Sequence, residues 1–356
     1  MSEEVELKKV RDQLDKLDDK MLEILNDRME LVKKVGDIKH KSGGAIYRPE
    51  RERQIIARLV NNNHGILNQN AIEAIFLEIF AISRNLERPE NVAFLGPEGS
   101  FTHQVAESKF GAMSSYLPIH SIKGVFREVS NGKAKFGVIP IENSSNGIVS
   151  DTVTCLKEYD LKIISEVILP IHHCLATNND SLRNIKKIYS KDIAFDQCSK
   201  FLEDFDLFGT ELIPVESTAK AAKLASTEPN SAAICSSVGA KMYNLPILFE
   251  NIEDSKDNKT RFFIVSDFEN SSSGNDKTTI LAKLPNKPGA LVDFLTDFDK
   301  AKINLTKIKS HIIEGLSLFF IDFDGHKNDA NVQEIFKKHS EIIKFLGSYI
   351  KEADDI

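Results

Sequence analysis

A seven-residue repeat of apolar positions near the N-terminus constrains the fold more than any other feature of the chain. One series comprises Leu7, Leu14, Met21, Arg28 and Val35, and the other comprises Val10, Leu17, Ile24, Leu31 and Ile38. This spacing predicts one long amphipathic helix whose apolar face packs on partner helices. Arg28 is the only charged residue in either series, and a guanidinium in an apolar seam is costly unless it is paired with an anion.

Two shorter helices are predicted to complete a helical module within residues 1–90. One starts at Pro49, and the other carries an apolar stripe from Ile72 to Leu86. Arg11 and Lys39 flank the apolar face of the first helix on one edge, so three cations converge there with Arg28. Three such helices bury little core alone, and we therefore expect self-association. The pattern fits either a coiled-coil dimerisation arm or a site for an anion.

Residues 136–149 predict a buried strand followed at once by polar side chains. Phe136 to Ile141 is a short apolar run. The polar residues after it are Glu142, Asn143, Ser144 and Ser145. Asn146-Gly147 predicts a turn and Ile148 the start of a helix. Open α/β sheets hold ligands at such strand ends, although a polar loop that only caps a helix would have the same pattern.

Strands and helices alternate through residues 91–268, which predicts a two-lobed α/β arrangement. The strand from Val92 to Leu95 leads into a glycine turn, and Ser100 or Thr102 is expected to cap the next helix. This turn lacks the spacing of dinucleotide-binding and P-loop motifs. Ser217 is expected to cap a later helix.

The C-terminal residues 278–356 predict a small α+β fold of the ferredoxin-like type. The expected order is strand 279–284, helix 290–300, strands 305–310 and 316–323, helix 331–338 and strand 342–349. Residues 269–276 are rich in Ser, Asn and Gly and are expected to form a flexible linker.

Composition excludes several classes of function. The net charge of −7 argues against nucleic acid and anionic membranes as partners. Four scattered cysteines indicate a reducing compartment, the N-terminus is acidic, and no apolar run is long enough to span a membrane, so we expect a cytoplasmic protein. His172 and His173 are adjacent on a predicted strand and point to opposite faces, so no metal site is expected.

Two motifs give the chain a specific resemblance to a known family. The segment 140–149 resembles the central motif of prephenate dehydratases, and Thr260-Arg261-Phe262 resembles their Thr-Arg-Phe signature. Nearly the whole chain resembles the bifunctional proteins in which chorismate mutase is fused to prephenate dehydratase and an ACT domain. The resemblance implies an all-α mutase at 1–90, a dehydratase with the periplasmic-binding-protein fold at 91–268, and a regulatory ACT domain at 278–356. It implies no cofactor.

For the helical module, the resemblance implies a chorismate site. Its expected binding residues are Arg11, Arg28, Lys39, Arg51, Glu52, Ser83 and Glu87. The arginines would hold the two carboxylates, with Arg11 coming from a second subunit, and Arg28, Lys39 and Glu87 would be catalytic. A Claisen rearrangement needs only a compact substrate conformer and positive charge at the ether oxygen. Many relatives have Gln at Glu87, and a carboxyl donates a hydrogen bond only when protonated, so mutase activity is expected to fall as pH rises. Many also have Asp at Arg48.

For the two-lobed domain, the resemblance implies a prephenate site with Thr260 and Glu142 as catalytic residues. Thr260 would assist the departing hydroxyl by hydrogen bonding together with neighbours such as Glu142. The expected binding residues are Ser100, Thr102, Asn143, Ser144, Ser217, Thr218, Arg261 and Phe262. A β-branched strand residue without a catalytic role is the alternative for Thr260.

The segment Pro288 to Val292 resembles the amino-acid-binding turn of ACT domains fused to dehydratases. The expected phenylalanine site comprises Gly289, Ala290, Leu291, Val292 and Ser310. Residues 309–312 keep only the Ser of the family's partner motif, so feedback inhibition is expected to be weak or altered. The partners implied are chorismate, prephenate, phenylalanine as effector, and further copies of the chain in a homodimer or larger assembly. The alternatives are a dehydratase with a helical dimerisation arm and a non-enzymatic amino-acid sensor.

Overall fold

The computed structural model describes residues 3–42, 49–87, 91–111, 113–145, 147–255, 257–313 and 316–351. The chain forms two compact units. One comprises Met1–Glu90 and Phe110–Ser114, and the other comprises Asn91–Lys109 and Ser115–Ile356. Arg48 lies outside the described residues.

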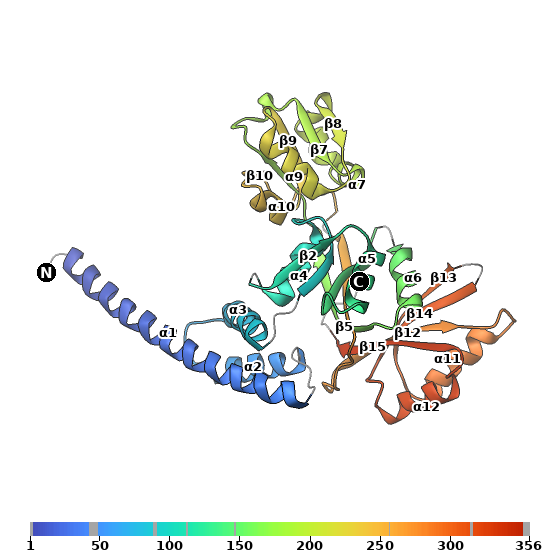
Figure 1. Cartoon of the computed structure of the whole chain (residues 1–356). Coiled ribbons are helices and arrows are strands. Elements are labelled where there is room, and N and C mark those ends of the chain that lie inside the picture. Colours follow the sequence, from blue (N-terminus) through green and yellow to red (C-terminus); the bar gives the residue numbers. More distant parts are fainter. Residues whose placement is uncertain are drawn as a thin grey trace. The chain divides into compact units, whose positions relative to one another are not determined.

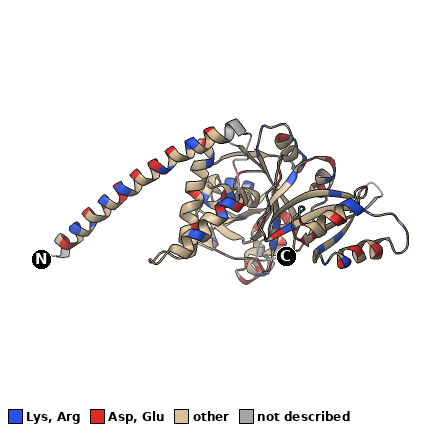
Figure 2. Ribbon diagram, turned by 90° about the horizontal axis from the view of Figure 1, so that it is seen from below, with Lys and Arg blue, Asp and Glu red and all other residues tan. Residues whose placement is uncertain are grey.

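The first unit is a module of three helices, as the apolar repeat predicts. These are α1 (Glu3–Ser42), α2 (Pro49–Asn62) and α3 (Gln69–Glu87). With 40 residues, α1 is about 60 Å long, and its N-terminal part extends beyond α2 and α3 (Figure 1). Residues of both charge signs follow one another along the described part of α1 (Figure 2). Residues 4–24 are all exposed, including the apolar Leu14 at 53% and Ile24 at 66%.

The first lobe of the second unit is built on one mixed sheet. Its strands are β1 (Asn91–Leu95), β2 (Ser115–Ile119), β3 (Phe136–Asn143), β4 (Gly147–Ile148), β5 (Lys162–Pro170) and β11 (Lys259–Ser266). The order is β2-β1-β3-β11-β5, with β4 on β3, and β11 runs antiparallel to both neighbours. Its helices are α4 (Phe101–Phe110), α5 (Ile122–Ser130) and α6 (Ser150–Glu158). The prediction that a helix starts at Ile148 was wrong, because Ile148 pairs with Glu142 in β4.

The second lobe surrounds a smaller sheet in the order β10-β6-β9-β7-β8. Its strands are β6 (Cys174–Thr177), β7 (Lys187–Ser190), β8 (Glu211–Pro214), β9 (Ser231–Cys235) and β10 (Ile247–Phe249). Its helices are η1 (Leu182–Asn184), α7 (Asp192–Gln197), α8 (Ser199–Asp204), η2 (Leu207–Gly209), α9 (Thr218–Thr227) and α10 (Ser237–Met242). The chain enters this lobe after β5 and leaves it before β11, so two segments connect the lobes.

The C-terminal part has the predicted βαββαβ order. Its elements are β12 (Asp276–Lys283), α11 (Ala290–Lys300), β13 (Leu305–Ile313), β14 (Leu316–Asp324), α12 (Ala330–Lys338) and β15 (Ile343–Ile350). The antiparallel sheet has the order β13-β14-β12-β15. Ile280, Phe294, Phe298 and Val332 belong to a core that joins the sheet to α11 and α12.

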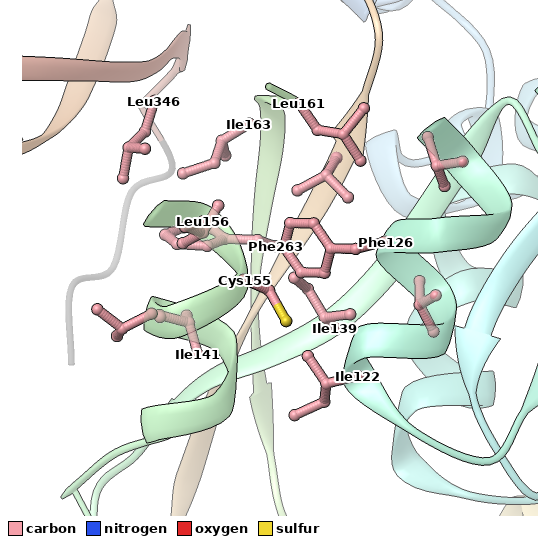
Figure 3. Packing of buried hydrophobic residues seen from close by; sticks show 14 of the residues in the cluster. Ile122, Phe126, Ile139, Ile141, Cys155, Leu156, Leu161, Ile163, Phe263 and Leu346 are labelled. Atoms are coloured by element: carbon pink, nitrogen blue, oxygen red, sulfur yellow. The ribbon is translucent and has the colours of Figure 1, made fainter. Parts of the chain in front are cut away.

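Apolar residues of this sheet also belong to the core of the first lobe, which the sequence did not predict. Leu281, Leu318, Phe320, Leu346 and Tyr349 lie in one cluster with apolar residues of β3, β5, α6 and β11. Figure 3 shows Leu346 beside Ile163 of β5. The first lobe and the C-terminal domain therefore share one hydrophobic cluster, in addition to the core between the C-terminal sheet and its helices.

The linker 269–276 is more fixed than its composition predicts. The Asn270 side-chain amide donates to the carbonyl oxygens of Ile164 at 2.7 Å and Ser348 at 3.2 Å. Asp276 accepts from the hydroxyls of Ser272 and Ser273 and begins β12. These bonds tie the linker to both domains.

Candidate functional site

A cavity of about 410 Å³ in the second unit brings together most of the residues predicted for prephenate. Seven of them line it, namely Ser100, Thr102, Asn143, Ser217, Thr218, Thr260 and Phe262. They come from both lobes. Ser100 and Ser217 stand at helix starts, where their Oγ atoms accept from the backbone N–H groups of His103 at 3.3 Å and Lys220 at 3.1 Å. The predicted caps are thereby confirmed.

Thr260 and Asn143 face each other across neighbouring strands. They pair in the register of β3 and β11, and the Asn143 Nδ2 donates to the Thr260 Oγ1 at 2.9 Å. Asn143 Nδ2 also lies 2.9 Å from the Asn258 Oδ1, which fixes the amide. Because the Thr260 oxygen accepts this bond and its hydroxyl proton meets no acceptor among the described residues, the proton is available to a ligand.

Glu142 and Arg261 lie on the opposite face of the same strands and do not line the cavity. Successive side chains of a strand point to opposite faces, so the neighbours of Asn143 and Thr260 must point away. Glu142 pairs instead with Lys307 at 2.5 Å and Lys309 at 3.6 Å, both on β13. The expected hydrogen bond between Thr260 and Glu142 was wrong, and Asn143 takes the place of that carboxylate.

Arg261 is part of a buried charge cluster between the first lobe and the C-terminal domain. Its guanidinium contacts Glu166 at 2.6 Å, Asp322 at 2.7 Å and the Tyr349 hydroxyl at 3.0 Å, and Lys277 lies 2.9 Å from Glu166. All five side chains are almost fully buried, and the two cations balance the two carboxylates. Burial alone would lower the pKa of Arg261, but Asp322, Tyr349 and Glu166 outweigh it and raise that pKa well above its usual value. The expected contact of Arg261 with prephenate is therefore replaced by an interdomain contact.

Ser144, also expected to bind prephenate, holds the chain beside the cavity. Its Oγ accepts from the Lys259 N–H at 3.0 Å and lies 3.3 Å from the Asp257 carbonyl. It thus fixes the start of β11, one residue before Thr260.

Five polar residues of the cavity were missed by the sequence reasoning, namely His173, Lys191, Gln197, Glu216 and Asn258. Lys191 follows β7 and Glu216 lies just beyond β8, so both stand at the carboxyl ends of parallel strands, where ligands are expected. That rule could have found them. His173 lies in a segment that connects the lobes, for which no local signal exists.

In the helical unit, Arg28, Ser83 and Glu87 lie where α1 packs on α3. The Arg28 Nη1 donates to the Ser83 Oγ at 2.7 Å, and its guanidinium carbon lies 6.0 Å from the centre of the Phe80 ring. Partial burial lowers the pKa of Arg28. Glu87 packs against Gly36, where a Cβ would lie 3.3 Å from the Glu87 Cα. Gly36 therefore permits the close approach of the two helices.

The other residues predicted for chorismate are placed differently. Glu52 forms an ion pair at 2.5 Å with Arg84, a buried residue that the sequence reasoning missed. Arg11 and Arg51 are exposed. The Lys39 side chain lies outside the part of the chain that the structure describes. Since Arg11 precedes Arg28 by 17 residues in one helix, the two are about 26 Å apart along α1 and cannot hold one small ligand within one chain.

The residues predicted for phenylalanine lie at the start of α11 and on an edge strand. Gly289 is the N-cap of α11 with φ of 82°, which favours glycine. Ala290 follows it, Leu291 packs on the domain core, and Val292 is 66% exposed. Ser310 is exposed on β13, the edge strand of the sheet.

Within the described ranges of the chain, no three His, Cys, Asp or Glu side chains lie close enough together to hold a metal ion. Nor does the described part contain a helix with the length and apolar character needed to cross a membrane.

Comparison with known proteins identifies related sequences along nearly the whole chain. The chorismate mutase type II family matches residues 10–88, the prephenate dehydratase family 92–270 and the ACT domain 278–341. A bifunctional chorismate mutase/prephenate dehydratase from Aquifex aeolicus is 40% identical and one from Pseudomonas aeruginosa is 38% identical. The alignments cover 97% and 99% of this chain and 98% and 99% of those proteins. A prephenate dehydratase from Arthrobacter aurescens, solved in complex with L-Phe, superposes with a TM-score of 0.66 at 34% identity, over 73% of this chain and 90% of that one.

Proposed function

This chain belongs to the family of bifunctional chorismate mutase/prephenate dehydratases, and we propose that it catalyses both reactions of that name in phenylalanine synthesis. The helical unit rearranges chorismate to prephenate, and the two-lobed domain converts prephenate to phenylpyruvate. The observation that carries the second assignment is the Thr260 hydroxyl, oriented by Asn143 in a cavity lined by both lobes.

The dehydratase reaction needs help chiefly at the departing hydroxyl. The ring C–O bond breaks with its electron pair leaving on oxygen, while the C–C bond to the ring carboxylate supplies the pair that completes the aromatic ring. Carbon dioxide and, after uptake of one proton, water are released. Thr260 donates a hydrogen bond to the leaving oxygen, because Asn143 has already taken up its acceptor side.

The substrate carboxylates require positive potential in an acidic protein. Lys191 supplies a cation at the cavity, and the first residues of α4 and α9 also line this cavity. Ser100 and Thr102 at the start of α4, and Ser217 and Thr218 at the start of α9, add hydroxyl donors to the positive ends of the two helix dipoles. These groups together bind the two carboxylates.

For the mutase, the helical unit works as a pair of subunits. The apolar residues of α1 between Val5 and Ile24 are exposed and would be stabilised by burial against a partner. The α1 helix of a second subunit has a matching apolar surface. Such a pair brings the Arg11 of one subunit to the Arg28 of the other, which the 26 Å rise along a single α1 prevents within one chain. Arg28 and Arg11 clamp the carboxylates, Lys39 faces the ether oxygen, and Glu87 adds a hydrogen bond when protonated.

We place the mutase at residues 1–90, the dehydratase at 91–268 and the C-terminal domain at 278–356. Phenylalanine acts as an effector by binding to this C-terminal domain. Support comes from the ACT match, from Gly289 and Val292, which are exposed at the start of α11, and from Ser310, which is exposed on an edge strand. These positions suit a site between two such domains. Titration calorimetry with phenylalanine tests this. Absence of binding to the wild-type chain would remove the effector from the proposal.

The cytoplasm is the proposed site of action. The four cysteines, Cys155, Cys174, Cys198 and Cys235, are all free thiols, and the Sγ atoms of Cys174 and Cys235 lie 3.9 Å apart as a hydrogen-bonded pair and not as a disulfide. Free thiols at this distance persist in a reducing compartment.

One experiment separates the two activities. Purified chain is given chorismate or prephenate, and prephenate and phenylpyruvate are followed. Arg28→Ala should abolish prephenate formation and spare dehydration, whereas Thr260→Ala should do the reverse and Thr260→Ser should retain dehydration. Arg58→Ala on the exposed face of α2 serves as the control for a lost arginine. A wild-type chain that dehydrates prephenate but leaves chorismate unchanged would make the helices a dimerisation arm, and one that acts on neither would favour an amino-acid sensor.

A further inference from the structure

His173 is a buried residue of the cavity for which the reaction described above has no use. It lies in the segment between β5 and β6 and is 3% exposed. Its backbone N–H donates to the Glu253 Oε2 at 2.8 Å, and its ring packs edge-on against Phe101, another cavity residue, with 5.7 Å between ring centres. The position of the imidazole is therefore fixed on two sides.

The two ring nitrogens of His173 differ in their partners. The Nε2 lies 2.9 Å from the Oε1 of Gln197. With the Gln197 amide in this orientation its oxygen accepts, which assigns the proton to the Nε2. The Nδ1 then holds a lone pair, and it is buried without a hydrogen-bond partner among the described residues. Burial lowers the pKa of His173 by more than Gln197 and Glu253 raise it, so the ring stays neutral near pH 7. A buried acceptor without a donor is rare in folded proteins, because ordered water or a ligand supplies the donor where the protein does not.

The chemistry of the substrate identifies that donor, provided that the proposed dehydratase function holds. Prephenate carries two carboxylates and a ketone, which accept hydrogen bonds at pH 7. Its ring hydroxyl is its only donor. We propose that the His173 Nδ1 accepts a hydrogen bond from the ring hydroxyl of prephenate and thereby orients the leaving oxygen toward Thr260.

This contact divides the work at the leaving oxygen between two residues. His173 takes the hydroxyl proton as a hydrogen bond, which leaves a lone pair of the same oxygen for the Thr260 O–H. No proton is transferred to His173. Phenylpyruvate has lost the ring hydroxyl, so it cannot make this bond. The hydrogen bond to His173 therefore favours binding of the substrate over binding of the product.

The test compares substrate and product on variants of the full-length chain. His173→Phe keeps an aromatic ring against Phe101 but removes the acceptor, whereas His173→Asn places an amide oxygen close to the former Nδ1 position. Steady-state kinetics gives kcat/KM for prephenate, and competitive inhibition gives the Ki of phenylpyruvate. We expect His173→Phe to lower kcat/KM at least tenfold with the Ki changed less than twofold, and His173→Asn to recover part of the loss.

The matched control is His172→Phe. His172 is the neighbouring histidine, lies outside the cavity lining, and pairs with the Glu253 Oε1 at 2.7 Å. It should leave both constants unchanged. Equal weakening of prephenate and phenylpyruvate by His173→Phe, or the same kcat/KM for His173→Asn and His173→Phe, would overturn the proposal. A wild-type chain without prephenate turnover would instead overturn the proposed function, so the two failures are distinct.

Discussion

The helix α1 and the sheet of the C-terminal domain both carry a large apolar surface, but only the sheet covers it within the chain. Leu281, Phe320 and Leu346 on the sheet are nearly inaccessible because they lie in the core of the first lobe. Leu14 and Ile24 on α1 remain more than half exposed. A surface closed by its own chain needs no partner, whereas the α1 surface predicts one.

Two arginines in these regions differ in the same way. Arg261 is saturated by two carboxylates and a tyrosine hydroxyl inside the protein. Arg28 is half-buried and donates to Ser83 alone among the described residues. A guanidinium has five N–H donors, so Arg28 keeps most of them for a ligand, while Arg261 has a structural role. The surroundings, and not the residue type, separate the binding arginine from the structural one.

Leu14→Glu tests the exposed apolar surface of α1 and should have the largest effect on activity. A carboxylate in the exposed apolar series prevents α1 from packing on a second α1, which removes the partner's Arg11 from the site. We expect the mutase rate to fall by about a hundredfold or more while prephenate dehydration is retained. Chorismate turnover and the mass in solution by light scattering measure both consequences. Lys16→Glu, on the outer face, is the control, and a mass and mutase rate unaffected by Leu14→Glu would contradict the prediction.

Asp322→Ala tests the buried charge cluster between the first lobe and the C-terminal domain. It leaves the buried Arg261 cation without one of its two carboxylates, which costs about 3–5 kcal/mol of unfolding free energy. Denaturant unfolding of the full chain measures this loss. The double variant Arg261→Met/Asp322→Leu removes both charges and should be more stable than Asp322→Ala. A single variant that loses less than about 1 kcal/mol would show that the cluster is not sealed from water.

Gly347→Ala sharpens the account of the shared core. A Cβ at this residue of β15 would lie 2.1 Å from the Ile163 carbonyl oxygen of β5, so one backbone has to move. Overpacking of this kind costs about 1–3 kcal/mol, which denaturant unfolding can measure. Gly209→Ala is the matched control, because a Cβ there meets nothing within 4 Å. Equal stability of the two variants would mean that the domains separate easily.

Lys344→Met tests a weaker polar link between the same domains. The Lys344 Nζ donates to the carbonyl oxygens of Lys157 and Tyr159 at 2.7 and 2.8 Å, at the end of α6. Its loss should cost about 1 kcal/mol in thermal or denaturant unfolding.

The pH dependence of that cost has a definite sign. Burial lowers the pKa of Lys344 in the folded chain, so the unfolded chain binds more protons between that pKa and the usual lysine value of about 10.4. Stability conferred by Lys344 therefore rises with pH across this window, and the gap between wild type and Lys344→Met should widen. A gap that narrows with rising pH would contradict the assignment.

Local patterns predicted the elements well but not the faces of the strands. The helix Ala290–Lys300 was predicted to the residue, since its signals lie within its own sequence. The direction in which Glu142 and Arg261 point depends on β3 continuing to Asn143. It also depends on partners that lie 165 residues from Glu142 and 61 residues from Arg261 along the chain. No short-range pattern contains that information.

One signal for the shared core was present in the sequence. Strand β14 carries consecutive apolar residues at Phe319, Phe320 and Ile321, which is typical of a strand covered on both faces. A sheet with helices on only one side would alternate apolar and polar residues. The missing alternation therefore indicated a second cover, although not that the first lobe provides it.

Side chains alternate between the two faces of β3 and β11, so adjacent residues of these strands have different roles. Asn143 and Thr260 face the cavity, while Glu142 and Arg261 hold the C-terminal domain. Random mutagenesis of these two dipeptides should therefore yield two separable phenotypes, with auxotrophy at any temperature from the first pair and temperature-sensitive growth from the second.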